Sequence, residues 1–286
     1  MDDAEVLETI RTAARRAAAE ALKVLEEGIG AKEQGRGSGG DISLLGDLVA
    51  EQTAISYLQE KIGSFKVVSE EIGEKTFGDR GSYTFIIDPL DGSRNYKRGA
   101  PFFTVSIAAA RGETIEDVVG GVVYAPLLNM EFYALKGRGA YLNGKKMEAK
   151  TSGDGLEGKI IAVSFPPKAS FLPSIFVSRL ATHGLALRML GSASLELAML
   201  ASGSIDAYID AWGIMRIVDI AAAQLIAREA GAYTLIGGKD GNPPFLSLKE
   251  RVYILVATGR DLAERLASLY RESFGYDIQD VFKVMR

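Results

Sequence analysis

The chain has 286 residues, of which 47% are hydrophobic and 24% are charged, as in an ordinary globular protein with a sizeable core. Its net charge is −4, from 33 Lys and Arg against 37 Asp and Glu, and this balance argues against a general nucleic-acid binder. The absence of cysteine excludes disulfides, thiol nucleophiles, zinc–thiolate sites and iron–sulfur clusters.

The first half of the chain predicts two helices followed by a run of strands. Apolar residues recur at helical spacing over residues 2–27, and a second helix is predicted over 44–61. The Gly-rich segment 31–40 between them predicts a loop. It holds a formal G-x-G-x-x-G pattern, but no strand precedes it, which argues against a dinucleotide site. Residues 65–148 carry β-branched and aromatic runs of strand length, with a hairpin at the Asn-Gly pair of "YLNGKK".

In the second half, predicted strands alternate with predicted helices. Strands are expected at "KIIAVSF" and "VYILVATG", and helices at "SASLELAMLASG", "DIAAAQLIAREAG" and "RDLAERLASLYRE". Asp219 is the expected N-cap of the second of these helices. We place a seam near residue 155, which gives an N-terminal α+β domain over 1–155 and a C-terminal α/β domain over 156–286.

The chain has one histidine, His183, which any Ser-His-Asp triad would have to use. Because Gly184 follows it, we expect this histidine near the end of a helix or in a turn. Hydrolytic chemistry in this chain is therefore not expected to depend on an imidazole.

Two aspartates lie three residues apart in "FIIDPLDGSRNY", residues 85–96. Pro89 fixes its own φ and keeps Asp88 extended, so the strand is predicted to end at Asp88. Asp91 is the predicted N-cap of a short helix that begins at the next glycine. The structural alternative is that the Asp88 carboxylate is solvated and the Asp91 carboxylate only caps the helix. EF-hand and D-x-D phosphatase patterns both fail on spacing.

The start of this short helix is a predicted anion site, because the N–H groups of Gly92 and Ser93 have no intrahelical partner. A phosphate there would be repelled by the carboxylates of Asp88 and Asp91 unless cations intervene. Mg²⁺ prefers a few carboxylates together with substrate phosphate oxygens, and the Leu90 carbonyl is a further candidate ligand. The sequence therefore predicts a magnesium-assisted phosphate site.

Further acids are candidates for the same site. Glu70 and Glu71 end the preceding strand, so they lie at the same sheet edge if the two strands are neighbours. Asp219 opens a helix in the second half. Each of these acids also has a structural alternative, as a surface carboxylate or as a helix cap.

These motifs carry a family resemblance. "VVSEE", "IIDPLDGSRNY" and "VDIAAAQLIAREAG" resemble the inositol monophosphatase family of Mg²⁺-dependent, lithium-sensitive sugar phosphatases. "GSGGDIS" and "NGKK" are most similar to its archaeal branch, whose members often hydrolyse both inositol 1-phosphate and fructose 1,6-bisphosphate. The resemblance implies an α+β fold, a layered α-β-α-β-α sandwich with an antiparallel sheet in the first half and a mixed sheet in the second. It also implies a homodimer with a role in carbohydrate metabolism, including gluconeogenesis.

The resemblance transfers roles to individual positions. It implies ligands for two or three Mg²⁺ ions at Glu70, Asp88, the Leu90 carbonyl, Asp91 and Asp219. It implies catalytic roles, in activating a metal-bound water, for Asp47, Glu70 and Ser93. It implies substrate contacts at Asp91, Gly92, Ser93, Gly191, Ser192 and Asp210. Arg188 and Arg216 are our candidates for a second phosphate, and Arg36 falls in a loop that is mobile in the family.

The chain departs from the family pattern at three places. Ser93 replaces the commoner threonine but keeps the hydroxyl, and Val218 stands where many members have tryptophan. The stretch 210–219 is longer than in the animal enzymes and holds Trp212 and Met215, which we expect to line the sugar pocket.

The expected function is hydrolysis of a small-molecule sugar or inositol phosphate by metal-activated water, without a covalent intermediate. One alternative is a 3′-phosphoadenosine 5′-phosphate phosphatase, which shares the metal motif. A second is a regulatory protein that keeps the fold without catalysis, and a third is a passive Ca²⁺-binding domain. No apolar run reaches the roughly 18 residues of a membrane span, and the acidic N-terminus is untypical of a signal or transit peptide. We therefore expect a cytoplasmic protein that binds neither membranes nor nucleic acid.

Overall fold

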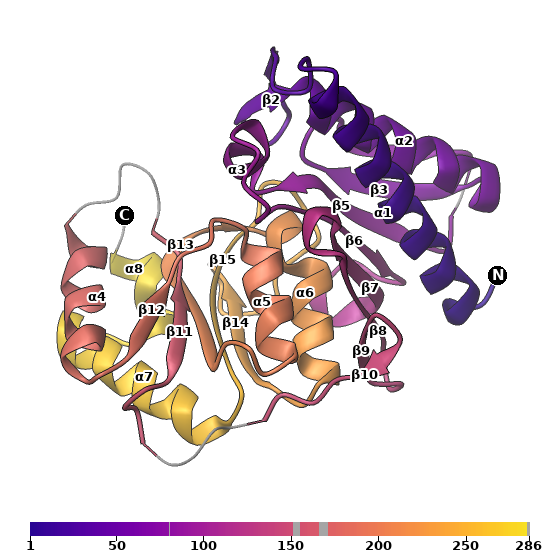
Figure 1. The fold of residues 1–286 in the computed structure, drawn as a ribbon. Helices are drawn as coiled ribbons and strands as arrows, with labels where there is room; N and C mark the ends of the chain where they lie inside the picture. Colours follow the sequence, from indigo (N-terminus) through magenta and orange to yellow (C-terminus); the bar gives the residue numbers. More distant parts are fainter. Residues whose placement is uncertain (80, 151–154, 166–170, 285–286) are drawn as a thin grey trace.

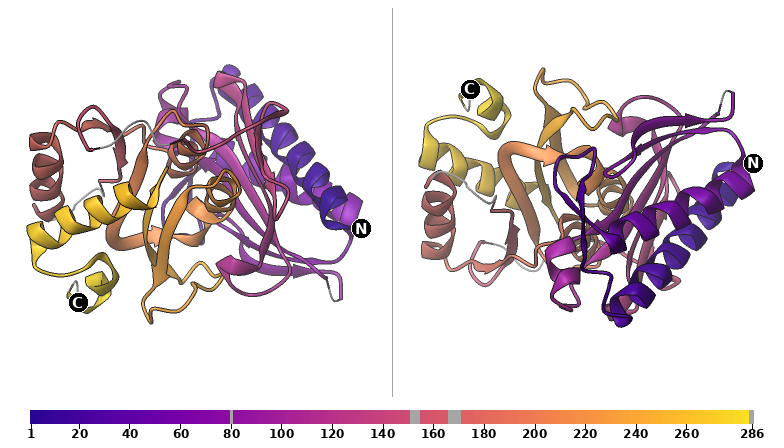
Figure 2. Two further views of the ribbon diagram at one scale, coloured as in Figure 1. Left: turned by 90° about the horizontal axis from the view of Figure 1, so that it is seen from below. Right: turned by 90° about the horizontal axis from the view of Figure 1, so that it is seen from above.

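The chain is folded into five layers in the order helix, sheet, helix, sheet, helix, as Figures 1 and 2 show for the computed structural model. The structure describes residues 1–79, 81–150, 155–165 and 171–284. Three pairs of helices form the helical layers: α1 (Asp3–Glu26) with α2 (Leu45–Ile62), α5 (Ala193–Ala201) with α6 (Ile217–Glu229), and α4 (Leu172–Thr182) with α7 (Arg260–Phe274). The predicted fold class, a layered α-β-α-β-α sandwich, is confirmed.

The first sheet has eight strands in the order β10-β9-β8-β7-β6-β5-β3-β4. It is antiparallel, as predicted, except that β3 and β5 run parallel to each other. Its strands are β3 (Phe65–Ser69), β4 (Gly73–Phe77), β5 (Thr84–Asp91), β6 (Thr104–Ala110), β7 (Val118–Ala125), β8 (Met130–Leu135), β9 (Ala140–Leu142) and β10 (Lys145–Lys146). The β9–β10 hairpin turns at the predicted Asn-Gly pair.

The second sheet has five strands in the order β12-β11-β13-β15-β14, and it is mixed as predicted. Its strands are β11 (Ile160–Val163), β12 (Ala186–Arg188), β13 (Ala207–Arg216), β14 (Tyr233–Gly238) and β15 (Arg251–Ala257). The predicted strands "KIIAVSF" and "VYILVATG" are β11 and β15, whereas β12, β13, β14 and helix α4 were not predicted.

Alternating apolar side chains in the strands bind the layers together. Val67 on β3 packs toward α1 and α2, and its neighbour Val68 packs on the other side, in a core shared with α5 and α6. The same core includes Ile254 of β15, so the middle helices contact both sheets. Helix α6 is buried over Ile217–Ala227, as expected for a helix enclosed between two sheets. The predicted two-domain division stays a prediction: its seam falls partly on residues 151–154, which lie outside the described residues.

The remaining elements are short. The Gly-rich segment 31–40 is not simply a loop, because it contains β1 (Glu33–Arg36), which forms a hairpin with β2 (Ile42–Leu44) directly after the segment. We call β1, β2 and the turn between them the Gly-rich hairpin. The others are α3 (Ser93–Lys97), α8 (Val281–Val284) and the 3-10 helices η1 (Ile115–Asp117), η2 (Pro126–Leu128) and η3 (Ile278–Asp280). His183 is the C-cap of α4, at a helix end as predicted. Within the described residues, we find no helix with the length and apolar character needed to cross a membrane.

Candidate active site

An irregularity in β5 arranges the two aspartates of the motif. Asp88 pairs with Ser106 of β6 and Asp91 pairs with Thr104, so three residue steps on β5 oppose two on β6. Such a β-bulge follows from Pro89, which has no N–H to donate to the ladder. Residues three apart in a regular strand face opposite sides, and the extra residue brings both carboxylates to the same side. The strand therefore runs to Asp91, and the prediction that it ends at Asp88 was wrong.

Asp91 does not cap its own helix. The N-cap of α3 is Gly92, whose φ of +92° favours glycine. The Oδ2 atom of Asp91 instead accepts hydrogen bonds from the hydroxyl groups of Ser192 (2.7 Å) and Ser194 (2.6 Å) and from the Ser194 amide (2.7 Å). These groups stand at the start of α5, so a carboxylate from the first sheet is anchored by a helix of the second half.

Asp88 is a buried carboxylate surrounded by other acids. Its side chain is 1% exposed, and its Oδ1 atom has no hydrogen-bond partner among the described residues. Burial, followed by the negative charges of Glu70, Asp91 and Asp219, raises the pKa of Asp88 well above its usual value. Since these charges act on one another, the four carboxylates that the sequence nominated lie in one region. Their role as metal ligands stays a prediction.

Arg216 lies among these acids and forms ion pairs with two of them. Its Nη1 atom is 2.5 Å from Oε1 of Glu70, and its Nη2 atom is 3.0 Å from Oδ1 of Asp219. Burial raises the pKa of Glu70 to about 7, with the charge of Arg216 opposing this shift and that of Asp219 adding to it.

Asp219 is also not the N-cap that we predicted. Helix α6 begins at Ile217 with Arg216 as its N-cap, and Asp219 is the third helical residue. Its Oδ2 atom accepts the backbone N–H of Arg216 at 3.1 Å, which is half of a capping box. The carboxylate therefore still stabilises the helix start, from a position three residues after the N-cap.

Asp47 and Ser93, the predicted water-activating pair, occupy separate elements. Asp47 lies in the first turn of α2, is 4% exposed, and its Oδ2 atom accepts the Leu44 amide at 2.6 Å. Burial, together with the charges of Glu71 and Glu70, raises the pKa of Asp47 to about 8. No hydrogen bond joins Asp47 to Ser93 within the described chain, so their joint action stays a prediction.

The Gly-rich hairpin covers the acid pair at the end of β3. The Gly39 amide donates to the Glu70 carbonyl at 2.7 Å, and the Ser38 hydroxyl donates to the Glu71 carbonyl at 2.9 Å. A Cβ atom added to Gly39 would lie 3.0 Å from Nη1 of Arg216, so this close approach favours glycine. Arg36, at the end of β1, donates to the Gly40 carbonyl at 2.7 Å.

A cavity of about 710 Å³ opens beside the acids. Six of the nominated residues line it: Asp91, Gly191, Ser192, Asp210, Arg216 and Asp219. Asp210 is 1% exposed, and burial raises its pKa to about 6 while hydrogen bonds from Ser164 and the Trp212 amide oppose the shift. Phe165, Met189 and Ile214 form an apolar part of the wall.

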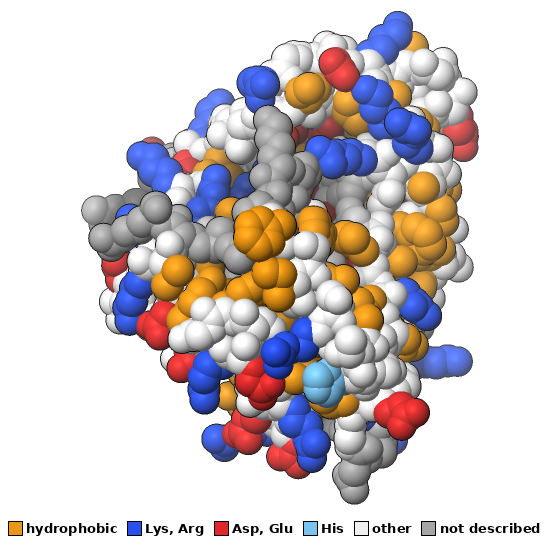
Figure 3. Space-filling view, turned by 90° about the vertical axis from the view of Figure 1, so that its left-hand side faces the viewer, with side chains coloured by type: hydrophobic (Ala, Val, Ile, Leu, Met, Phe, Trp, Pro, Cys, Tyr) orange, Lys and Arg blue, Asp and Glu red, His pale blue; other side chains and the backbone are white. Residues whose placement is uncertain are grey.

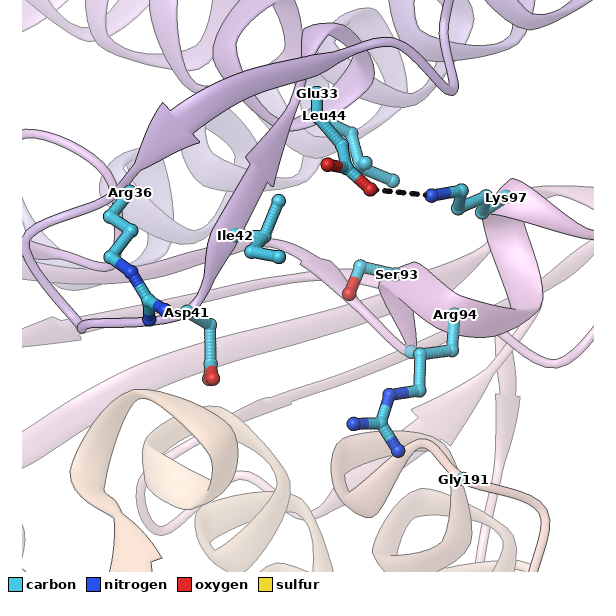
Figure 4. Close-up of a pocket in the computed structure, with 10 residues that line it drawn as sticks. Glu33, Arg36, Asp41, Ile42, Leu44, Ser93, Arg94, Lys97 and Gly191 are labelled. Atoms are coloured by element: carbon cyan, nitrogen blue, oxygen red, sulfur yellow. Dashed lines mark hydrogen bonds and ion pairs between the residues drawn. The ribbon is translucent and has the colours of Figure 1, made fainter. Parts of the chain in front are cut away.

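A second cavity, of about 520 Å³, lies between the Gly-rich hairpin and α3 (Figure 4). Gly92, Ser93 and Arg94 line it from α3, and Arg36 and Asp41 line it from the hairpin. Asp41, Arg94 and Gly191 border both cavities, so the two are neighbours on either side of the motif. The predicted phosphate cradle thus faces a cleft lined by three cationic side chains, Arg36, Arg94 and Lys97, and by two acidic ones, Glu33 and Asp41.

Two residues with predicted substrate roles lie outside the lining of the larger cavity. Arg188 lines a neighbouring cavity of about 340 Å³, which shares Phe165 and Met189 with the larger one, and its Nη1 atom donates to the Leu187 carbonyl. Its contact with a second phosphate stays a prediction. In the stretch 210–219, Asp210, Met215 and Arg216 line the larger cavity, whereas Trp212 is 3% exposed and packs in an aromatic cluster with Phe176 and Phe274. Figure 3 shows the side of the molecule that lies on the left in Figure 1, and apolar side chains gather in the middle of that surface.

Sequence reasoning missed several residues that shape the site. Asn95 donates to the carbonyls of Phe102 (2.6 Å) and Leu190 (2.8 Å), which ties the motif to the loop before α5. Glu196 lines the larger cavity and accepts the Leu190 amide at 2.6 Å; burial raises its pKa to about 8. Glu51 accepts the amides of Glu71 and Ile72, both at 3.2 Å. A carboxylate at an otherwise buried helix position was the available signal for the two glutamates.

The donors of the site suit a hard divalent cation, because they are carboxylate oxygens with no soft ligand among them. The buried, unpartnered Oδ1 atom of Asp88 is a free donor for such an ion. In the part of the chain that the structure describes, no three acidic or histidine side chains are arranged to hold an ion as they stand. The guanidinium of Arg216 lies between Glu70 and Asp219 and forms ion pairs with both.

Comparison with known proteins identifies the family. The model of the inositol monophosphatase family matches residues 2–274. The chain belongs to this family. As a family member it is a phosphoric monoester hydrolase, which the sequence motifs had predicted.

Its relatives carry two kinds of name. A Methanothermobacter thermautotrophicus protein named fructose-1,6-bisphosphatase/inositol-1-monophosphatase is 34% identical over 242 residues, or 80% of this chain and 84% of that protein. The Nus factor SuhB of Salmonella typhimurium is 36% identical over 189 residues, covering 65% of this chain and 68% of that protein. Among solved structures, the extragenic suppressor protein SuhB from Bartonella henselae superposes with a TM-score of 0.80 at 27% identity, over 94% of this chain and 99% of that one.

Proposed function

We propose that this family member is a Mg²⁺-dependent phosphomonoesterase that acts on inositol 1-phosphate, fructose 1,6-bisphosphate or both. The observation that carries the proposal is the buried Oδ1 atom of Asp88, which has no partner in the described residues and lies among three further acids. A negatively charged ester is repelled from such a place unless divalent cations neutralise it. The bifunctional name of the Methanothermobacter relative supports the choice of substrates.

Glu70, Asp88, the Leu90 carbonyl, Asp91 and Asp219 are the residues that would hold two or three Mg²⁺ ions. Bound there, Mg²⁺ supplies Lewis acidity that lowers the pKa of water and neutralises charge on the ester oxygens. The serine hydroxyls at the start of α5 hold the Asp91 carboxylate in one orientation. The buried position of Asp88 keeps bulk water away from its free oxygen.

The remaining residues act on the substrate and on the proton. The amides of Gly92 and Ser93 donate to the phosphate, and the Ser93 hydroxyl orients the attacking water. The Asp47 carboxylate takes up the proton of that water. Asp210 accepts a hydrogen bond from a sugar hydroxyl in the cavity of about 710 Å³.

A bisphosphate requires a further cation at the far end of the sugar. Arg94 and Arg251 line the larger cavity together with Arg216, and Arg251 donates only to backbone carbonyls. These two arginines join Arg188, which borders the neighbouring cavity, as candidates.

The test is a phosphate-release panel on the purified chain. Inositol 1-phosphate, fructose 1,6-bisphosphate and 3′-phosphoadenosine 5′-phosphate are supplied separately, each with Mg²⁺ and with EDTA. We expect release from one or both sugar substrates only with Mg²⁺. Faster release from the nucleotide would favour the alternative phosphatase, and release of equal rate in EDTA would contradict metal dependence.

A regulatory role is the second candidate, favoured by the 36% identity to a protein named as a Nus factor. The presence of all four nominated acids favours catalysis over this alternative. A chain that releases no phosphate from any panel member with Mg²⁺, Mn²⁺ or Zn²⁺ would favour the regulatory role. The homodimer and the cytoplasmic location stay predictions, and light scattering coupled to size exclusion would test the former.

A further inference from the structure

We infer that Arg216 and divalent ions compete for the same carboxylates, so that a metal ion binds only when the guanidinium leaves Glu70 and Asp219. The inference rests on the proposed function in assigning these two acids to the metal site. It adds a property of this chain: an internal cation holds the site in the metal-free protein.

The contacts of Arg216 are those of a bound counter-ion. Besides the pairs with Glu70 (2.5 Å) and Asp219 (3.0 Å), its Nε atom donates to Oδ2 of Asp219 at 3.3 Å. Its Nη1 atom also lies 3.1 Å from Oδ2 of Asp41 on the Gly-rich hairpin. The Arg216, Glu70 and Asp219 side chains are 17%, 14% and 12% exposed, whereas that of Asp41 is 77% exposed. All three guanidinium nitrogens therefore contact carboxylates. The Glu70 and Asp219 carboxylates are largely shielded from water, and the Asp41 carboxylate is exposed.

The charge balance explains why the guanidinium stays there. Four carboxylates, Glu70, Asp88, Asp91 and Asp219, meet one cation, and within the described residues no other Lys or Arg forms an ion pair with them. Uncompensated carboxylates in a shielded site repel one another and disfavour the folded state. Arg216 lowers this repulsion when no metal ion does so.

The same contacts exclude a metal ion. The Glu70 and Asp219 oxygens that accept N–H donors from Arg216 point their lone pairs at the guanidinium, which has no acceptor of its own to offer a metal. A positive charge within a few ångströms also repels a divalent ion. This is consistent with the lack of a ready-made metal cluster in the described part of the chain.

A place for the displaced guanidinium exists. Arg216 lies at the end of β13 and lines the cavity of about 710 Å³, which Asp41 also borders. A guanidinium that keeps Asp41 and gives up the two shielded acids would stand in this cavity, where it can donate to a phosphate oxygen of the substrate. Metal binding would thereby strengthen anion binding.

The test uses the full-length protein and Mn²⁺ as the probe, without substrate. Arg216→Gln removes the charge and keeps a polar side chain, while Arg98→Gln is the matched control, because Arg98 at the C-cap of α3 lines neither site cavity and forms no ion pair in the described residues. We expect Arg216→Gln to bind Mn²⁺ at least about tenfold more tightly by calorimetry and to melt at a lower temperature than the wild type in EDTA. Arg98→Gln is expected to change neither quantity.

A second measurement tests whether metal binding strengthens anion binding, with inorganic phosphate as the anion probe. In the wild type, saturating Mn²⁺ is expected to tighten phosphate binding, and in Arg216→Gln this tightening is expected to shrink. Arg216→Lys, which keeps the charge on a shorter side chain, serves if the glutamine variant does not fold, and it should show a smaller gain in Mn²⁺ affinity. An unchanged or weaker Mn²⁺ affinity in the Arg216 variants would overturn the inference, as would a wild type that binds no Mn²⁺. A wild type that binds Mn²⁺ with the expected variant pattern, yet hydrolyses no phosphomonoester, would overturn the proposed function alone.

Discussion

Glu131 in the first sheet and Glu70 directly after its strand β3 are both shielded glutamates, but they differ in the number of cations around them. Glu131 on β8 accepts hydrogen bonds from Arg15 (2.7 and 2.8 Å) and Arg11 (2.7 Å) of α1. Burial by itself raises the pKa of Glu131, but these hydrogen bonds outweigh it and leave the pKa lowered. Glu70 shares the single cation Arg216 with Asp219, and its pKa is raised to about 7.

The difference separates a structural ion pair from a site with surplus charge. At Glu131 two guanidinium groups match one carboxylate, so the contact joins α1 to β8 and leaves nothing to bind. Around Asp88 the acids outnumber the cations, which lowers stability unless another cation arrives. Shielded acids in excess of their cations are thus the feature that marks the candidate active site.

The largest expected effect is on catalysis. Asp88→Asn removes the unpartnered carboxylate. We expect turnover at saturating Mg²⁺ to fall by roughly a thousandfold or more, because one of the proposed metal ligands is lost. The same variant should melt at a higher temperature than the wild type in EDTA, since the amide carries no charge that folding must neutralise by taking up a proton. Phosphate release and thermal unfolding measure the two effects. Near-normal turnover would contradict the assignment of Asp88.

The matched variant at the other site should behave in the opposite way. Glu131→Gln leaves Arg11 without a carboxylate on its shielded side, and we expect the free energy of unfolding to fall by about 3 kcal/mol. Turnover below the melting transition should stay within about twofold of the wild type, because Glu131 lies outside the lining of both site cavities. Urea unfolding measures the loss. A variant as stable as the wild type would remove the contrast between the two sites.

The two sites also predict opposite dependences on pH. In the metal-free protein the raised pKa of Glu70, about 7 against an ordinary 4.5, means that the folded state keeps a proton which the unfolded chain releases. Stability from this group is therefore present below about pH 4.5 and lost as pH rises to 7, by about 3 kcal/mol. The lowered pKa of Glu131 makes its contribution present above its ordinary pKa and lost as pH falls.

Melting temperatures in EDTA between pH 4 and pH 8.5 test this contrast. Glu70→Gln should remove part of the fall on the alkaline side, and Glu131→Gln should remove part of the fall on the acidic side. Saturating Mg²⁺ should flatten the alkaline fall in the wild type. Identical curves for the two variants would show that the two glutamates do not differ as described.

The smallest expected effect concerns the anchor of Asp91. Ser194→Ala removes the hydroxyl that donates to Asp91 and contacts Thr104 at 2.6 Å. We expect unfolding free energy to fall by about 1 kcal/mol and the Mg²⁺ requirement to rise a few-fold, with little change in kcat. Ser202→Ala, at the C-cap of the same helix, is the control and should change only stability. A Mg²⁺ requirement equal to that of the wild type would argue against the anchor.

The parts of the fold that were predicted from the sequence have strong local patterns. The helices α1, α2, α5, α6 and α7 and the strands with apolar runs were found because burial on one or both faces leaves a period in the sequence. Strand β4 was missed because it is an edge strand whose middle three residues are exposed. The hairpin strand β1 is exposed along its whole length and shows no period.

The candidate site was predictable in its composition but not in its pairings. The four acids stood out through their motif and the family resemblance. The partners of Asp91 lie 101 and 103 residues away, and Arg216 lies 146 residues from Glu70, so no local spacing encodes these contacts. The cap of α3 was assigned wrongly for the same reason, because Asp91 looks like a local cap but serves a distant helix. The cap of α6 was assigned wrongly for a local reason, because Asp219 occupies the third helical position of a capping box instead of the N-cap.

The hydrogen bonds between Asp91 and the start of α5 affect the order in which parts of the molecule fold during synthesis. The first sheet is complete once Lys146 has been synthesised, whereas the serines that fix Asp91 belong to a later part of the nascent chain. Until those serines arrive, the carboxylate has no fixed orientation. An amino-terminal fragment that ends between the sheets should therefore lack the assembled centre even where its strands have paired, and activity should arise only when the carboxy-terminal part docks.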